Sequence, residues 1–305
     1  MNKALITGIG GFAGSHLSSF LRKSGNQVFG IERRESDDKN VFQCDILDYS
    51  AVLKIMKEIM PNTIFHLAAQ SSVKKSWDSK EDTHDINVKG TENILRAVAE
   101  AGCDSIVIIV SSGEVYGTNK NVPFTETSET MPNSPYSQSK LAQENIGLKF
   151  FRENGLKVIV TRAFPHTGPG QAPEFVCSEF AKKIAEIEKG KREFIDVGNL
   201  DAERDYTDVR DIVKAYALCA EKCVPGEIYN ISSGEAVSIK KILDTLRSFS
   251  DFDIVVKQNP GKMRLSDIPI LLGGSSKFRE ITGWEPSIKI EDTLKEMLEY
   301  WRERT

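Results

Sequence analysis

The chain has 305 residues, of which 40% are hydrophobic and 28% charged, a composition typical of a globular protein large enough for two lobes. Its net charge of −4 gives no support for nucleic-acid binding, and no run of 18 apolar residues predicts a membrane span. Five scattered cysteines and four histidines lack metal-ligand spacing. We therefore expect reduced thiols, no metal, no membrane or nucleic-acid partner, and a cytoplasmic location.

Short apolar runs alternate with longer helical patterns in the first half of the chain. The apolar runs are continuous rather than alternating, as expected for strands buried on both faces. Together the two patterns predict a doubly wound α/β domain with a parallel sheet. The predicted strands are 4–7, 27–31, 63–68, 105–110 and 157–163, and the predicted helices lie near 14–24, 50–60, 85–101 and 136–153.

The pattern changes after residue 163. Residues 164–175 are rich in proline and glycine and predict a loop, and a short strand is expected at 228–232. Further helices are expected at 175–189, 208–222, 238–248 and 291–303. We expect two lobes with a ligand cleft between them. Residues 1–163 with about 205–232 would form the first lobe, and 164–204 with 233–305 a smaller C-terminal α/β substrate lobe.

The stretch "TGIGGFAGSHL" (7–17) follows the first strand and opens the first helix. Gly8, Gly11 and Gly14 are spaced three apart, whereas Gly10 would satisfy a shifted version of the dinucleotide fingerprint. In both versions, small residues let the backbone approach a pyrophosphate at a helix N-terminus. The alternative is a purely structural turn. The position between strand and helix favours dinucleotide binding, and hence a Rossmann-type domain.

The second predicted strand ends at "GIERRES" (30–36), where the residue type indicates which cofactor is bound. An acidic side chain there favours the ribose of NAD, and arginine favours the 2′-phosphate of NADP. Here Glu32 is followed by Arg33 and Arg34, so the choice between NAD and NADP stays open. Asp45 follows a short predicted strand and is either an adenine contact or a solvated loop residue.

The segment "SPYSQSK" (134–140) reads as a helix start, with Tyr136 and Lys140 on one face a turn apart. The spacing is common by chance, and a surface helix is the simpler interpretation. A ketone that accepts a hydride at carbon needs a proton at oxygen, and a phenol can supply it. A neighbouring ammonium would lower the pKa of that phenol.

Motifs along nearly the whole chain resemble the extended short-chain dehydrogenase/reductase superfamily, in its nucleotide-sugar branch. They are "TGIGGFAG", "HLAAQSSV" (66–73), "NVKGT" (87–91), "SSGEVYG" (111–117), "PYSQSK", "RAFPHTGPGQ" (162–171), "RDYTDVRD" (204–211) and "YNISSG" (229–234). The resemblance implies cofactor contacts from Phe12, Ala13, Ile46, Leu67, Ala68 and Ala69. It also implies catalytic roles for Ser112, Tyr136 and Lys140, with Lys140 contacting the nicotinamide ribose.

Four stretches resemble the substrate lobe of the GDP-4-keto-6-deoxy-D-mannose reductases, which form GDP-D-rhamnose: "GPGQ" (168–171), "VGNLDAERDYTDVRDIVKAY" (197–216), "MRLSDIP" (263–269) and "TGWEP" (282–286). The sister GDP-mannose 4,6-dehydratases are similar in several of these places. The resemblance implies substrate contacts from Ser72 and Val176, and arginine clamps on the diphosphate from Arg204 and Arg264. Glu114 either takes part in loss of water or only hydrogen-bonds the sugar. One position departs from the family pattern Arg-x-x-Asn-x-x-Gly, because Pro165 replaces the asparagine. A hydrogen bond must then be lost or taken over, with His166 as the candidate.

The resemblance predicts NAD(P)H-dependent reduction of the 4-keto group of a GDP-4-keto-6-deoxy-hexose. A 4,6-dehydratase or 4-epimerase on the same scaffold is the alternative, in which the cofactor is recycled. A non-catalytic dinucleotide-binding regulator is a third possibility, against which the intact Ser–Tyr–Lys set argues. Family members dimerise through helices equivalent to 85–101 and 136–153, so a homodimer is expected.

Overall fold

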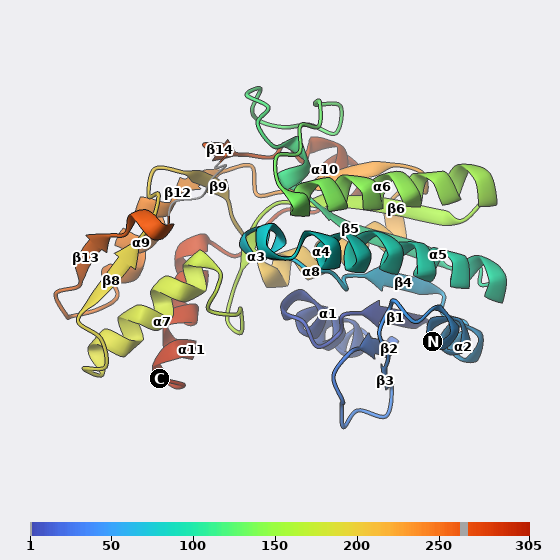
Figure 1. Ribbon diagram of the computed structural model, residues 1–305, viewed down its shortest axis with the longest axis horizontal. Helices are drawn as coiled ribbons and strands as arrows, with labels where there is room; N and C mark the ends of the chain where they lie inside the picture. Colours follow the sequence, from blue (N-terminus) through green and yellow to red (C-terminus); the bar gives the residue numbers. More distant parts are fainter. Residues whose placement is uncertain (1, 263–267) are drawn as a thin grey trace.

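The computed structural model describes residues 2–262 and 268–305, and its centre is a seven-stranded parallel sheet (Figure 1). Every neighbouring pair in this sheet is parallel, as the continuous apolar runs predict. The strand order is β11 (Ile228–Ile231), β6 (Lys157–Ala163), β5 (Ile106–Ser112), β4 (Thr63–His66), β1 (Lys3–Thr7), β2 (Gln27–Glu32) and β3 (Val41–Gln43).

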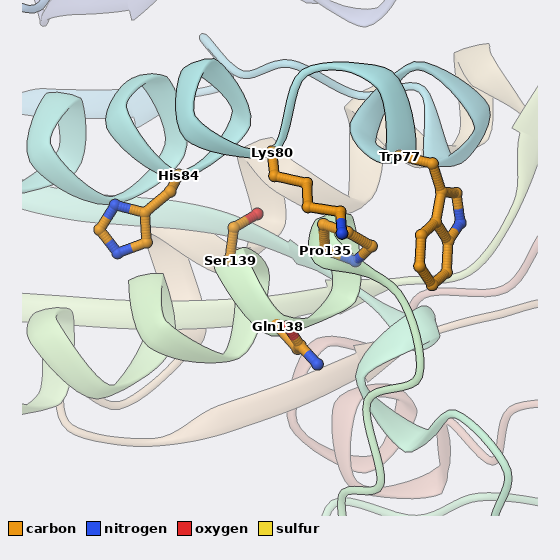
Figure 2. A pocket seen from close by; sticks show the side chains of 6 residues that line it. All are labelled: Trp77, Lys80, His84, Pro135, Gln138 and Ser139. Atoms are coloured by element: carbon orange, nitrogen blue, oxygen red, sulfur yellow. The ribbon is translucent and has the colours of Figure 1, made fainter.

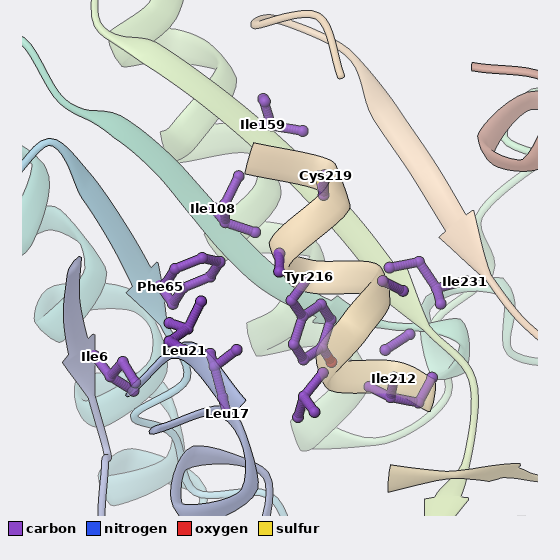
Figure 3. Close-up of a cluster of buried hydrophobic side chains, with 14 of the residues drawn as sticks. Ile6, Leu17, Leu21, Phe65, Ile108, Ile159, Ile212, Tyr216, Cys219 and Ile231 are labelled. Atoms are coloured by element: carbon purple, nitrogen blue, oxygen red, sulfur yellow. The ribbon is translucent and has the colours of Figure 1, made fainter. Parts of the chain in front are cut away.

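Helices cover both faces of the sheet, and each face has its own hydrophobic core (Figure 1). One face carries α1 (Phe12–Lys23) and α8 (Val209–Lys222), and Figure 3 shows Tyr216 of α8 in the same buried cluster as Phe65 and Ile108. The other face carries α2 (Tyr49–Ile59), α5 (Gly90–Ala101) and α6 (Pro135–Asn154). This is the Rossmann-type doubly wound architecture that the sequence predicts.

The five predicted strands and four predicted helices of the first half are confirmed, with one change at the start of the third helix. The chain from residue 85 first forms a π-helical turn, η1 (Asp85–Lys89), before α5 begins. Two short helices before it, α3 (Val73–Asp78) and α4 (Lys80–His84), and the 3₁₀ turn η2 (Gly113–Tyr116) were not predicted.

The smaller lobe lies at one end of the molecule, where three helices pack around a two-stranded parallel pair (Figure 1). The helices are α7 (Val176–Glu188), α9 (Ile239–Arg247) and α11 (Ile290–Arg302), and the strands are β8 (Phe194–Val197) and β13 (Val255–Gln258). All three helices were predicted, as were α8 and β11. Among the described residues, none of the helices is both long and apolar enough to span a bilayer.

Several other short elements, most of them strands of two or three residues, were not predicted from the sequence. Strands of two or three residues have too few side chains to show a period, and their partners are distant in the chain. They are β7 (His166–Thr167), β9 (Glu203–Asp205), β10 (Thr207–Asp208), β12 (Ala236–Ser238), β14 (Ile270–Leu271), η3 (Pro260–Lys262) and α10 (Ser276–Thr282).

Candidate active site

The predicted site residues gather where parallel strands end. The carboxyl ends of β1, β4 and β5 lie at one edge of the sheet, since β4 pairs with both β1 and β5. They are followed by Gly8, by Leu67, and by the Ser112–Glu114 turn. In an open parallel sheet this edge is where ligands bind.

The glycine loop is packed so tightly that side chains would not fit. Gly8 has φ +71°, and a Cβ there would lie 3.0 Å from the Ala68 backbone. A Cβ on Gly14 would lie 2.2 Å from the Gly8 carbonyl oxygen, which brings α1 close against the loop. Gly11 is the N-cap of α1 and donates its N–H to the Gly8 carbonyl at 3.0 Å. The loop therefore presents the N-terminus of α1 to a pyrophosphate, and fits a dinucleotide.

Glu32 faces this loop from the end of β2. Its carboxylate accepts hydrogen bonds from the Gly10 N–H at 3.0 Å and the Arg33 N–H at 2.9 Å. A Cβ on Gly10 would lie 2.8 Å from the Glu32 carboxylate, so a side chain there would displace this carboxylate from the loop. Arg33 and Arg34 are exposed beside it. Both a ribose acceptor and two phosphate-binding cations are thus present at one strand end.

The other predicted cofactor residues lie in three different settings. Leu67, Ala68 and Ala69 are half-buried after β4, and the Ala68 N–H donates to the Thr7 hydroxyl at 3.1 Å. Asp45 is exposed, and its carboxylate accepts from the Leu47 N–H at 2.9 Å.

The last three predicted cofactor residues, Ile46, Phe12 and Ala13, are buried or half-buried. Ile46 is buried in the hydrophobic core, where its side chain fills the space beside Gly90, so only its backbone can reach a ligand. Phe12 and Ala13 are the half-buried first residues of α1.

Tyr136 and Ser112 meet at the end of β5. The Ser112 hydroxyl lies close enough to the phenol of Tyr136 to lower its pKa, against the larger effect of burial, and Ser112 Oγ accepts from the Glu114 N–H at 3.2 Å. Tyr136 lies in the first turn of α6, which begins with Pro135 and is closed by a capping box between Ser134 and Ser137. The cap fixes the helix start, and with it the position of the phenol.

The expected lowering of the pKa of Tyr136 by Lys140 is wrong in this structure. Burial of the phenol is the largest effect and raises its pKa to about 12, with a further rise from the Glu114 carboxylate. Lys140 Nζ donates instead to the Val110 carbonyl at 2.7 Å and to Gln143 Oε1 at 2.9 Å. Burial lowers the pKa of Lys140 to about 7, against the opposing charge of Glu144. At neutral pH the phenol is therefore protonated and able to donate.

The predicted substrate residues lie around the start of the smaller lobe. Arg204 on β9 is buried and donates to the Ile268 carbonyl at 2.7 Å. Val176 begins α7, and Ser72 caps α3 by accepting from the Lys75 N–H at 3.2 Å. Arg264 lies outside the described residues.

Pro165 and His166 follow β6 at the same edge of the sheet. The Pro165 carbonyl accepts from the Thr207 N–H at 3.0 Å, so its one hydrogen-bonding group is already used. The His166 ring stacks on Phe12 with centroids 6.3 Å apart, and its Nδ1 lies 3.1 Å from the Phe164 carbonyl oxygen. Burial lowers the pKa of His166. The imidazole therefore lies against the first residue of α1.

A buried ionic network behind the site was not predicted. Glu144 pairs with Arg162 at 2.8 Å and accepts from the Ser111 hydroxyl at 2.5 Å. Arg162 donates to the Tyr116 hydroxyl at 3.0 Å, which donates to Asn230 Oδ1 at 2.7 Å. The face of α6 that carries Lys140 is polar although buried, which was the available signal.

A surface pocket of about 390 Å³ lies on the solvent side of α6, between that helix and the α3–α4 segment (Figure 2). Trp77, Lys80 and His84 face Gln138 and Ser139 across it. None of its lining residues belongs to the predicted cofactor or substrate set, although Pro135 and Ser139 are chain neighbours of Tyr136 and Lys140.

The site thus combines a phenol beside a serine hydroxyl, a buried lysine one turn away, and a glycine loop shaped for a pyrophosphate. This is the arrangement of an enzyme that uses NAD(P). Similarity to known proteins narrows this class to a family. A family model described as GDP-mannose 4,6 dehydratase matches residues 5–297, and the chain belongs to this family of nucleotide-sugar short-chain dehydrogenases/reductases.

Individual relatives match over nearly their full length. The chain is 30% identical to the GDP-6-deoxy-D-mannose reductase of Pseudomonas aeruginosa, over 99% of this chain and 98% of that protein. It is 29% identical to the GDP-mannose 4,6-dehydratase of Yersinia enterocolitica, over 98% and 93%.

Solved structures agree with the sequence comparisons. The structure of RMD from Pseudomonas aeruginosa complexed with NADPH has a TM-score of 0.90 and 29% identity, with all of both chains covered. A UDP-glucose 4-epimerase of Thermotoga maritima with UDP-glucose also has a TM-score of 0.90, at 30% identity over 99% of each chain.

Proposed function

We propose that this protein is an NAD(P)H-dependent reductase of the 4-keto group of a GDP-4-keto-6-deoxy-hexose, converting GDP-4-keto-6-deoxy-D-mannose to GDP-D-rhamnose. The observation that carries the proposal is the placement of Tyr136 beside Ser112 at the end of β5, with Lys140 one turn further along α6. The similarity to a GDP-6-deoxy-D-mannose reductase along almost the whole chain supports the choice of substrate.

In the proposed reaction each side chain has a separate task. The bound reduced nicotinamide supplies the hydride. Tyr136 gives its phenolic proton to the oxygen at C4 as negative charge develops there. Ser112 hydrogen-bonds the same oxygen and orients the sugar. Lys140 would contact the nicotinamide ribose, as the family resemblance implies.

The substrate side of the proposal rests on charge and on the predicted division into lobes. Residues 1–163 and about 205–232 would bind the cofactor, and 164–204 with 233–305 would bind the sugar nucleotide. Arg204, with Arg264, would bind the diphosphate through the planar guanidinium fork. Ser72 and Val176 would contact the sugar or nucleotide. Proline has no N–H and no polar side chain, so position 165 gives no donor to the substrate, and its carbonyl accepts from the Thr207 N–H.

One observation favours a second candidate, a GDP-mannose 4,6-dehydratase. The Glu114 carboxylate is close enough to raise the pKa of Tyr136, so a second acid–base group lies beside the phenol. Loss of water needs such a group to remove a proton from carbon. In the reductase, Glu114 would only hydrogen-bond the sugar.

We also propose a homodimer formed through α5 and α6, as the family resemblance implies. The pocket in Figure 2 opens between α6 and the segment that leads into α5, and would then lie next to the partner subunit. All five cysteines are free and buried, which fits the reducing cytoplasm that we propose as its location.

The decisive assay follows reduced-nicotinamide absorbance with GDP-4-keto-6-deoxy-D-mannose, using NADH and NADPH separately. We expect cofactor loss equal to the GDP-deoxyhexose formed. The matched variant Tyr136→Phe should lose roughly 10²- to 10⁴-fold in kcat, because it lacks the proton donor. No cofactor loss with this substrate, together with 4-keto product from GDP-mannose, would replace the reductase by the dehydratase.

A further inference from the structure

A chain of five buried side chains runs from the catalytic lysine to the start of the glycine loop. Lys140 Nζ donates to Gln143 Oε1 at 2.9 Å, and Gln143 Nε2 donates to Thr91 Oγ1 at 2.8 Å. Thr91 Oγ1 lies 2.8 Å from His66 Nε2, and His66 Nδ1 lies 2.7 Å from Thr7 Oγ1. All five are nearly inaccessible to solvent, with Lys140 the most exposed at 4%. We call these five residues the neutral chain, because the four side chains that follow Lys140 are all uncharged.

The direction of every hydrogen bond in the neutral chain follows from its neighbours. The Thr91 hydroxyl donates its one hydrogen to the Asn87 carbonyl at 2.6 Å, so it accepts from both Gln143 and His66. His66 therefore carries its proton on Nε2, and its Nδ1 accepts from the Thr7 hydroxyl. Burial, followed by the charge of Lys140, lowers the pKa of His66 to about 3, which keeps the ring in this neutral form.

The hydrogen bonds of Lys140 fix the orientation of its ammonium. Its ammonium has three N–H groups, of which one binds the Val110 carbonyl and one binds Gln143. A tetrahedral ammonium held at two corners has the direction of its third N–H fixed. Both acceptors are neutral, so neither pairs with the lysine charge.

The charged and titratable groups around Lys140 come from several elements. Glu144 and Tyr136 lie on α6 with it, His66 lies on β4, and Glu114 lies on η2 beside Tyr136. The Glu144 carboxylate is paired with Arg162 of β6. The ammonium itself contacts the neutral Gln143 amide and the Val110 carbonyl.

We propose that Gln143 is a positioning residue of the reductase, which holds Lys140 through its amide oxygen while Thr91 and His66 hold the amide in place. The neutral chain keeps the ammonium oriented without pairing it with a carboxylate, so Lys140 stays titratable near neutral pH. The role in turnover rests on the proposed function, whereas the effect on Lys140 itself is measurable without substrate.

Two substitutions at one position test this in opposite directions. Gln143→Glu places a carboxylate at the amide oxygen, and Gln143→Met removes the acceptor. Gln143→Glu should raise the pKa of Lys140 by about one pH unit or more, because the carboxylate stabilises the ammonium. Gln143→Met should lower this pKa, because the ammonium loses an acceptor. Gln138, exposed on the same helix, supplies matched controls as Gln138→Glu and Gln138→Met.

The measurement is an NMR titration of the ligand-free protein with ¹³C-labelled lysine side chains, in which Lys140→Arg identifies the signal. We expect the Lys140 midpoint to shift in opposite directions in the two Gln143 variants and to stay unchanged in the two Gln138 variants. The pH profile of kcat should move in the same direction as the Lys140 midpoint in each variant. If Gln143→Met does not fold, Thr91→Val removes the anchor of the amide and should lower the Lys140 midpoint instead.

Lys140 midpoints that agree within about 0.3 pH unit among the wild type, Gln143→Glu and Thr91→Val would overturn the inference. A shifted midpoint in a protein that turns over no GDP-4-keto sugar would retain the role of Gln143 at Lys140 and reject the proposed function. A merely structural role would lower stability in these variants but would leave the Lys140 midpoint unchanged.

Discussion

Two polar networks hold the two sides of α6, and they handle charge in opposite ways. On the β4 and α5 side is the neutral chain from Lys140 through Gln143 to Thr7. On the β6 and β11 side is the ionic network of Ser111, Glu144, Arg162, Tyr116 and Asn230. Lys140 and Glu144 are four residues apart on the same helix, so the two networks are neighbours.

The comparison explains why the Arg162–Glu144 pair stays charged while Lys140, on the same helix as Glu144, stays titratable. Burial opposes the charge of Arg162, but its bonds to Glu144 and Tyr116 outweigh burial and raise the pKa of the guanidinium. Lys140 has neutral acceptors, so burial prevails and its pKa falls to about 7. The kind of partner, rather than the depth of burial, separates the two groups.

The largest expected effect is on the ionic network. Arg162→Met leaves the Glu144 carboxylate buried without its partner, since the two side chains are only 5% and 1% exposed. We expect a loss of roughly 3–5 kcal/mol in the free energy of unfolding, measured by urea denaturation.

The matched control for Arg162 is Arg302, which also pairs with a glutamate, Glu188, but is 29% exposed. Arg302→Met should cost about 1 kcal/mol or less, because water screens the pair and can solvate the carboxylate that remains. Equal losses for the two variants would contradict the distinction between a buried and a screened pair.

The second prediction concerns the acid stability of the neutral chain. With the pKa of His66 lowered to about 3, the unfolded chain binds a proton between about pH 6.5 and pH 3 that the folded protein does not. The contribution is complete above pH 6.5, and stability falls as the pH decreases, by at most about 1.4 kcal/mol per pH unit for one proton. His66→Gln should flatten this decline.

Denaturant unfolding at several pH values between 7 and 4 measures the effect. His84→Gln is the control, because His84 is a histidine whose side chain is 58% exposed. Parallel stability profiles for the wild type and His66→Gln would show that His66 is not held neutral by the fold.

The smallest expected effect is the difference in stability loss when each of two buried tyrosines, Tyr116 and Tyr216, loses its hydroxyl. The Tyr116 hydroxyl belongs to the ionic network, whereas among the described residues the buried Tyr216 hydroxyl has no hydrogen-bond partner (Figure 3). Tyr116→Phe should cost about 1–3 kcal/mol by leaving Arg162 and Asn230 short of a partner. Tyr216→Phe should be neutral or stabilise by about 1 kcal/mol. Thermal unfolding of the two variants compares them, and the reverse order would contradict the role of the network.

The parts of the site that lie close together in the chain could be predicted from the sequence. The Gly8–Gly14 spacing is local and predicts a tight strand-to-helix loop. The Tyr136–Lys140 spacing is also local and predicts two side chains on one helix face. The long strands were predictable for the same reason, because burial on both faces leaves a continuous apolar run.

What could not be predicted depends on contacts across the fold. Tyr116 and Asn230 are 114 residues apart, and His66 meets Thr91 only after β4 and α5 pack together. The pKa of Tyr136 was predicted in the wrong direction, because spacing shows a neighbouring ammonium but not the burial that outweighs it. The carbonyl of Pro165 is likewise used by Thr207, in a pairing of two-residue strands that carry no periodic signal.

The most direct test of the central claim is the fate of the hydride. Single-turnover reaction of the protein with GDP-4-keto-6-deoxy-D-mannose and nicotinamide cofactor dideuterated at C4 should give a GDP-deoxyhexose that carries one deuterium at C4 of the sugar, detected by mass spectrometry and NMR. This result would establish net reduction at the ketone. Products formed without deuterium, and with the cofactor unchanged, would contradict the reductase and indicate a reaction in which the cofactor is recycled.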